Sequence, residues 1–84
     1  MPEIIIYSTR ICPYCERAKQ LLEKKGREYT VIDVSESESL RAEMIEKAGG
    51  KRTVPQIFIN GKHIGGFDDM NALDKKGELD TLLG

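Results

Sequence analysis

The chain is poor in several residue types, and each shortage excludes a class of protein. It has no tryptophan, a single histidine (His63) and only two cysteines in 84 residues. Tetrahedral zinc needs four ligands, so these three side chains cannot complete a structural zinc site within one chain. Two cysteines in a reducing compartment are rarely a structural staple, because thiols there stay reduced unless they cycle. We therefore expect no metal, and the remaining alternatives are a redox pair or a chance pair of buried thiols.

The sequence also lacks an excess of charge and a long hydrophobic run. Thirteen basic residues against fourteen acidic ones leave a net charge of −1, so no summed field draws the chain to nucleic acid or to a membrane surface. Only three isoleucines (residues 4–6) precede the first polar residues, which fits neither a secretory signal nor a membrane span. We expect a cytoplasmic protein that forms one domain over residues 1–84 and is a monomer.

Both cysteines lie in one stretch of four residues, Cys12-Pro13-Tyr14-Cys15. An apolar, β-branched run that is typical of a buried strand precedes it, and an amphipathic helical pattern follows it. Proline is favoured at the first helical position, so Cys12 is predicted at a helix N-terminus. Two thiols separated by two residues can close into a small disulfide ring and open again, which indicates redox chemistry.

Hydrophobic periodicity and turn signals predict the order βαβαββα, an α/β fold with a mixed four-stranded sheet flanked by helices. The first two strands are joined through a helix and are predicted to be parallel, whereas an Asn-Gly turn makes the last two an antiparallel hairpin. The predicted strands are 3–8, 28–34, 56–59 and 62–64. The predicted helices run from 13 to 25, from a cap at Ser35 or Ser37 to Gly49, and from a cap at Asp68 or Asp69 to 83 with an interruption at Gly77.

Position along the first helix predicts different roles for the two thiols. Only the thiolate attacks a disulfide, and the partial positive charge of a helix N-terminus stabilises that anion. Arg10 and Arg17 are close in sequence and are expected to add to this effect. Cys12 is therefore the predicted nucleophile, and the more buried Cys15 is suited to resolve the mixed disulfide formed on Cys12.

Four motifs together resemble those of the dithiol glutaredoxins, in the same order and spacing over essentially the whole chain: Cys12-Pro13-Tyr14-Cys15, Thr53-Val54-Pro55, Gly65-Gly66 and Asp68-Asp69. The resemblance implies a thioredoxin-like fold and an enzyme that reduces protein disulfides and glutathione mixed disulfides, with glutathione as reductant. It implies that the partners are glutathione and disulfide-containing or glutathionylated proteins, ribonucleotide reductase among them.

The resemblance also implies where glutathione binds. Thr53 and Val54 would precede a cis-proline and offer backbone N–H and C=O groups to the cysteinyl part of glutathione. The acidic pair would meet its amino group. Many relatives carry a lysine where this chain has Thr9, so either Arg10 or the Lys51-Arg52 pair is left to meet a carboxylate. The implied glutathione-binding residues are Arg10, Tyr14, Thr53, Val54, Pro55, Gly66, Asp68 and Asp69.

Other interpretations remain open from the sequence. Pro55 could be an ordinary trans-proline at a strand start, and Gly66 part of a simple turn. His63 is expected to face solvent on the hairpin. Some glutaredoxin-like proteins hold an iron–sulfur cluster between two subunits, and others take electrons from thioredoxin reductase. Pro13 and the second thiol argue against the cluster.

Overall fold

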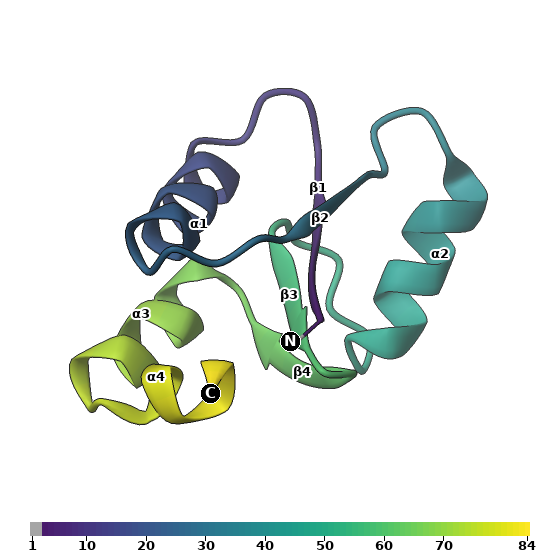
Figure 1. Ribbon diagram of the computed structural model, residues 1–84. Helices are drawn as coiled ribbons and strands as arrows, with labels where there is room; N and C mark the ends of the chain where they lie inside the picture. The colour runs from purple at the N-terminus through teal and green to yellow at the C-terminus, as the bar shows by residue number, and fades with distance from the viewer. Residues whose placement is uncertain (1–2) are drawn as a thin grey trace.

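The computed structural model describes residues 3–84, which fold into a four-stranded sheet with helices on both faces (Figure 1). The elements in chain order are β1 (Ile4–Ser8), α1 (Pro13–Lys24), β2 (Thr30–Asp33), α2 (Glu38–Lys47), β3 (Gln56–Ile59), β4 (Lys62–Gly65), α3 (Phe67–Lys75) and α4 (Glu78–Leu83). None of the helices in this part of the chain is long and apolar enough to cross a membrane.

The strands lie in the order β2-β1-β3-β4. β1 pairs with β2 in parallel and with β3 in antiparallel, and β3 pairs with β4 in antiparallel. The helix α1 therefore forms the crossover between the two parallel strands, as the sequence predicts. The predicted mixed sheet and its hairpin are confirmed, with Asn60 and Gly61 at φ 52° and 80° in the hairpin turn.

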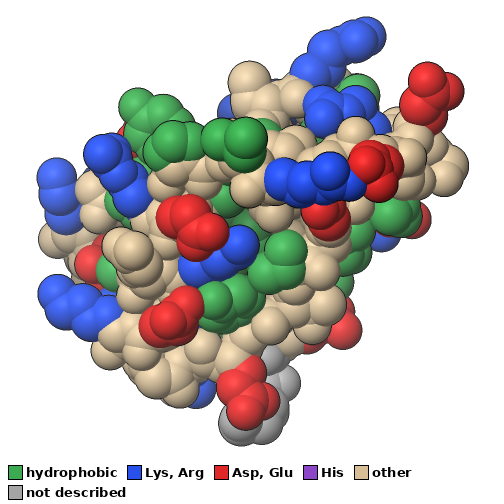
Figure 2. Space-filling model, turned by 90° about the horizontal axis from the view of Figure 1, so that it is seen from above, with side chains coloured by type: hydrophobic (Ala, Val, Ile, Leu, Met, Phe, Trp, Pro, Cys, Tyr) green, Lys and Arg blue, Asp and Glu red, His purple; other side chains and the backbone are tan. Residues whose placement is uncertain are grey.

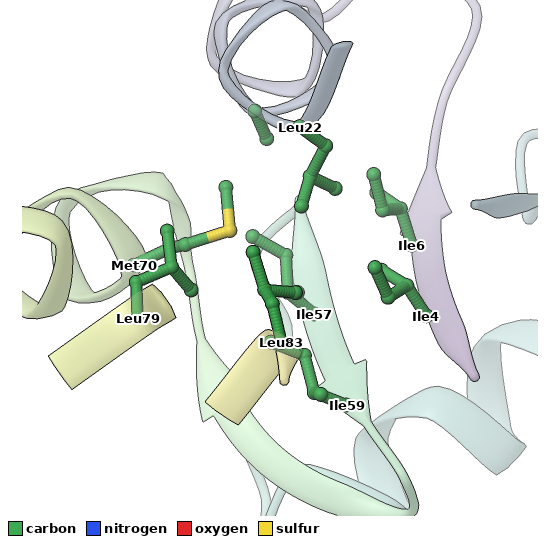
Figure 3. Packing of buried hydrophobic residues seen from close by; sticks show 9 residues of the cluster. Ile4, Ile6, Leu22, Ile57, Ile59, Met70, Leu79 and Leu83 are labelled. Atoms are coloured by element: carbon green, nitrogen blue, oxygen red, sulfur yellow. The ribbon is translucent and has the colours of Figure 1, made fainter. Parts of the chain in front are cut away.

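Each face of the sheet carries its own hydrophobic cluster because successive side chains of a strand point to opposite faces. On one face, α1, α3 and α4 cover the larger cluster, called here the α1-side cluster (Figure 3). Its buried members are Ile4, Ile6, Ala18, Leu22, Ile57, Ile59, Met70, Leu79 and Leu83. On the other face, α2 covers the α2-side cluster, whose buried members are Tyr7, Val34, Met44 and Phe58.

The edge strand β2 differs from its predicted pattern. The sequence groups Val34 with Tyr29 and Val31 and puts Ile32 on the opposite face. Strict alternation instead places Val34 and Ile32 together in the α2-side cluster, while Tyr29 packs against the α1-side cluster. Val31 remains 39% exposed because no helix covers its position at the edge of the sheet.

The structure shows which residues cap α2 and α3: one of the two predicted caps of α2 is confirmed, and neither predicted cap of α3 is. Ser37 caps α2, since the Leu40 N–H donates to its Oγ at 3.2 Å. The cap of α3 is Gly66, so the predicted caps at Asp68 and Asp69 are wrong. Asp69 instead lies at the third helical position and accepts a hydrogen bond from the Gly66 N–H at 2.9 Å. The carboxylate therefore ties the start of the helix to the turn before it.

The predicted last helix is two helices, α3 and α4, separated by Gly77 at φ 77°. Lys25, the residue that follows α1, forms ion pairs with both of these helices. The Lys25 Nζ lies 2.6 Å from a carboxylate oxygen of Asp74 and 2.9 Å from one of Asp80. Hydrogen bonding to Asp74, and then to Asp80, raises the pKa of Lys25.

Candidate active site

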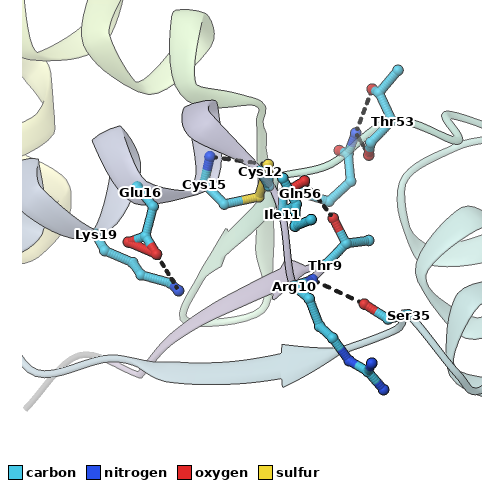
Figure 4. Close-up of a disulfide and its surroundings, with 10 residues drawn as sticks. All are labelled: Thr9, Arg10, Ile11, Cys12, Cys15, Glu16, Lys19, Ser35, Thr53 and Gln56. Carbon is cyan, nitrogen blue, oxygen red and sulfur yellow. Dashed lines mark hydrogen bonds and ion pairs between the residues drawn. A yellow bond between two sulfur atoms is a disulfide. The ribbon is translucent and has the colours of Figure 1, made fainter.

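Cys12 and Cys15 lie at the start of α1 and are joined by a disulfide (Figure 4). Cys12 is the N-cap, with an extended backbone at φ −151° and ψ 96°, and Pro13 follows at the first helical position. The Cys12 Sγ accepts a hydrogen bond from the Cys15 N–H at 3.1 Å. The same helix N-terminus would stabilise a thiolate at this sulfur after reduction.

The two sulfurs differ in accessibility. Cys15, in the first turn of the helix, is 1% exposed, whereas Cys12 is half-buried at the surface. A substrate sulfur can therefore reach Cys12 but not Cys15. This is the arrangement expected of an attacking thiol and a resolving thiol.

The two arginines near the cysteines are engaged elsewhere. Arg10 forms an ion pair with Glu36, and its side chain extends away from the disulfide toward the β2–α2 connection (Figure 4). The Arg17 guanidinium lies 5.3 Å from the centre of the Tyr14 ring, in a cation–π arrangement. The helix N-terminus is therefore the positive group that contacts the Cys12 sulfur directly.

A groove of about 330 Å³ begins at Tyr14, the residue between the cysteines. One wall is the segment that leads into β3, and the other is the turn and first residues of α3. The lining residues are Tyr14, Lys51, Thr53, Val54, Pro55, Gln56, Gly66, Phe67, Asp68 and Asp69. Tyr14 and Phe67 face each other at one end, with ring centroids 6.5 Å apart.

The two walls approach each other at Pro55 and Gly66. The Val54-Pro55 peptide bond is cis, as the resemblance implies. A Cβ atom at Gly66 would lie 3.5 Å from the Pro55 carbonyl oxygen, which is ordinary van der Waals contact between the two walls. Glycine at this position places no side chain in the groove.

Charges of both signs line the groove. Lys51 comes from one wall and Asp68 from the other, and neither takes part in an ion pair within residues 3–84. Charged side chains of both signs are also interspersed over the face of the molecule seen in Figure 2. The groove is therefore suited to a small ligand that carries both an amino group and carboxylates.

The structure brings together most of the predicted binding residues and leaves one apart. Those that line the groove are Tyr14, Thr53, Val54, Pro55, Gly66, Asp68 and Asp69. Arg10 is not among them, and Lys51, the alternative cation, is. Sequence reasoning missed Gln56, whose only signal is its position directly after Pro55. It also misplaced His63, which is half-buried with its Nε2 2.7 Å from the Gln56 Oε1.

No group of three or more side chains able to hold a metal ion is found in residues 3–84.

Comparison with known proteins agrees with a thiol–disulfide site. The family model described as glutaredoxin matches residues 4–64. A glutaredoxin of Pseudomonas aeruginosa is 52% identical over 83 residues, which is 99% of this chain and 98% of the relative. Glutaredoxin 3 of Escherichia coli K12 is 48% identical, with 99% of both chains covered.

A solved structure is similar as well. The crystal structure of a buckwheat glutaredoxin–glutathione complex has a TM-score of 0.87 and 34% identity, and the match covers 95% of this chain and 74% of that one. Family, fold and cysteine pair agree, and the chain belongs to the glutaredoxin family of thiol–disulfide oxidoreductases with a thioredoxin-like fold.

Proposed function

We propose that this protein uses glutathione to reduce protein disulfides and glutathione mixed disulfides through a Cys12–Cys15 dithiol/disulfide cycle. The observation that carries the proposal is the groove beside Tyr14, whose walls offer backbone groups of Thr53 and Val54 and charges of both signs. Glutathione is a tripeptide with one amino group and two carboxylates, so its charges complement this groove. The buckwheat relative was crystallised with glutathione.

The geometry suggests an orientation for glutathione. Its cysteinyl backbone lies along Thr53 and Val54 in a strand-like pairing, with its sulfur toward Cys12. Its amino group lies near Asp68. A carboxylate lies near Lys51, which we favour over Arg10 because Arg10 is paired with Glu36 outside the groove.

The reaction with a glutathionylated protein needs only Cys12. Its thiolate attacks the glutathionyl sulfur, the protein thiolate leaves and takes up a proton, and Cys12 carries glutathione. The thiolate of a second glutathione attacks the same glutathionyl sulfur, which releases oxidised glutathione and restores the Cys12 thiolate.

A protein disulfide needs both cysteines. Cys12 attacks one sulfur and forms a mixed disulfide with the substrate, and the Cys15 thiolate then attacks the Cys12 sulfur. The products are a reduced substrate and the Cys12–Cys15 disulfide, which two glutathione molecules reduce in turn. As the sequence predicts, we place the protein in the cytoplasm as a monomer, with ribonucleotide reductase among its substrates.

The test compares the wild type with Cys15→Ser, using glutathione and glutathione reductase as the electron supply. We expect the variant to retain turnover of a small glutathione mixed disulfide and to lose reduction of a protein disulfide. Cys12→Ser should lose both, because no other thiol can form the mixed disulfide. Turnover by Cys12→Ser, or equal loss of both reactions in Cys15→Ser, would contradict these roles.

A second arm tests the electron donor. Thioredoxin reductase with its own reductant replaces glutathione in the same assay. Turnover with thioredoxin reductase alone would overturn the glutathione dependence, although the cysteine roles would stand.

A further inference from the structure

The side chain of Gln56 connects the groove to the β3–β4 hairpin behind it. Gln56 is 1% exposed, and its Nε2 donates to the carbonyl oxygen of Thr53 at 2.9 Å and to the Thr53 hydroxyl at 3.2 Å. Its Oε1 lies 2.7 Å from the Nε2 of His63. The chain of contacts therefore runs from His63 through Gln56 to the backbone of the groove wall.

The donors and acceptors in this series of hydrogen bonds fix each other's orientation. A peptide carbonyl can only accept, so the amide nitrogen of Gln56 must face Thr53 and its oxygen must face His63. That oxygen is also only an acceptor, and His63 must carry a proton on Nε2 to donate to it. His63 is itself held in place by its cross-strand partner Phe58, whose ring centroid is 5.0 Å away.

The orientation of the Thr53 carbonyl also fixes the direction of the Val54 N–H. The Thr53–Val54 peptide bond is trans, so the Thr53 C=O and the Val54 N–H point in opposite directions from one rigid plane. Gln56 holds the carbonyl toward the buried side, and the Val54 N–H therefore points away from Gln56. Within residues 3–84 this N–H makes no hydrogen bond, and Val54 lines the groove.

We propose that Gln56, oriented by His63, is a positioning residue that aims the Val54 N–H into the groove. This N–H would donate to the backbone carbonyl of the cysteinyl part of glutathione, so the inference rests on the proposed function. Pre-orientation matters because a free peptide plane would have to be ordered when the ligand binds. Within residues 3–84 neither Gln56 nor His63 forms a hydrogen bond to the reacting sulfurs, and both act through the groove wall.

The central test replaces Gln56 with methionine, which has a similar length but no hydrogen-bonding amide. We expect the KM for a small glutathione mixed disulfide to rise about tenfold, as for the loss of one hydrogen bond, with kcat changed less than about twofold. The rate at which iodoacetamide alkylates reduced Cys12 should stay at the wild-type value. Equal KM values, or a loss of kcat together with slower alkylation, would overturn the positioning role.

His63 provides a matched pair of variants. In His63→Phe the ring can still pack on Phe58 but cannot donate, and we expect KM to rise about threefold. In His63→Gln an amide nitrogen stands the same number of bonds from Cβ as the original Nε2, and KM should return toward the wild-type value. The same KM for both variants would contradict a role of His63 as donor.

Nitrogen chemical shifts of the imidazole test the network without any ligand. We expect His63 in the wild type to be protonated on Nε2 at neutral pH, and hydrogen exchange of the Val54 amide to change in Gln56→Met. A neutral ring protonated on Nδ1 would overturn the inference even if glutathione turnover is normal. Absence of wild-type turnover with glutathione would instead overturn the proposed function and leave this network intact.

Discussion

Cys12 and Cys15 are the same residue type three positions apart, yet their surroundings differ. Cys12 precedes the first helical residue and is half-buried, whereas Cys15 is 1% exposed. The sequence predicts this difference because it depends only on where the helix starts. The bonds from Gln56 to Thr53 could not be predicted in the same way, since they depend on how the residues before Pro55 lie against the side chain of the first residue of β3.

Tyr29 gives a prediction at the scale of one residue. Its hydroxyl donates to a carboxylate oxygen of Glu23 at 2.5 Å. This hydrogen bond, and then burial, raises the pKa of Tyr29 from 10.0 to about 12. Since the folded pKa lies above the unfolded one, the stabilisation is complete below pH 10 and is lost as the pH rises from about 10 to about 12.

Absorbance of the phenolate during a pH titration measures this group directly. Tyr29→Phe should remove one ionisation step near pH 12, and Glu23→Gln should move that step toward the ordinary value because the negative charge is gone. Comparison with Tyr29→Phe separates the step from that of Tyr7, whose pKa burial and Glu43 also raise. An unchanged titration curve in Glu23→Gln would contradict the assigned cause.

At the scale of elements, the turn between β4 and α3 depends on Gly65. Its φ is +117°, and a Cβ atom there would lie 2.3 Å from Oδ2 and 2.8 Å from Cγ of Asp69. That carboxylate cannot move away freely, because it accepts the Gly66 N–H. We expect Gly65→Ala to lower the free energy of unfolding by about 2–4 kcal/mol and to weaken turnover, since Gly66 and Asp68 line the groove.

Gly61 is the matched control for this substitution. It also has a positive φ, +80°, but nothing lies within 4 Å of a Cβ built there. Gly61→Ala should therefore cost only the backbone strain, about 1–2 kcal/mol, and leave the KM unchanged. Denaturant unfolding of both variants measures the comparison, and equal losses would show that the Asp69 contact adds nothing.

The predicted elements were most accurate where local pattern decides the outcome. The Asn60-Gly61 turn, the start of α1 and the succession of elements along the chain as far as β4 all follow from signals within a few residues. The cap of α3 did not, because the glycine that precedes Phe67 takes the cap position and Asp69 reaches back to it. Val34 was assigned to the wrong face because the expected pattern grouped it with Val31, three residues earlier, whereas alternation places it with Ile32.

At the scale of the whole molecule, one sheet separates two hydrophobic clusters. The central strands β1 and β3 contribute side chains to both clusters, so neither cluster can lose its packing without disturbing strands that support the other. A domain of this size also unfolds as a unit in most cases. We therefore expect a single cooperative transition and not the separate melting of two layers.

Two conservative truncations on opposite faces test this expectation. Ile59→Val shortens a side chain of the α1-side cluster, and Val34→Ala does so in the α2-side cluster. We expect losses of about 0.5–1.5 and about 1–3 kcal/mol, respectively. The two positions share no cluster: Ile59 pairs with Ile4 at one end of β1, whereas the Val34 N–H bonds to the Ser8 carbonyl at the other end.

Because the two sites are independent yet belong to one folding unit, their losses should add within about 0.5 kcal/mol in the double variant. Far-ultraviolet circular dichroism follows the helices, and tyrosine fluorescence follows side-chain packing, during denaturant unfolding. Within each of the four proteins, the two signals should change at the same denaturant concentration, although that concentration is expected to fall from the wild type to the double variant. Transitions that separate between the two signals in either single variant would show that each face of the sheet unfolds by itself, and would refute the shared dependence on β1 and β3.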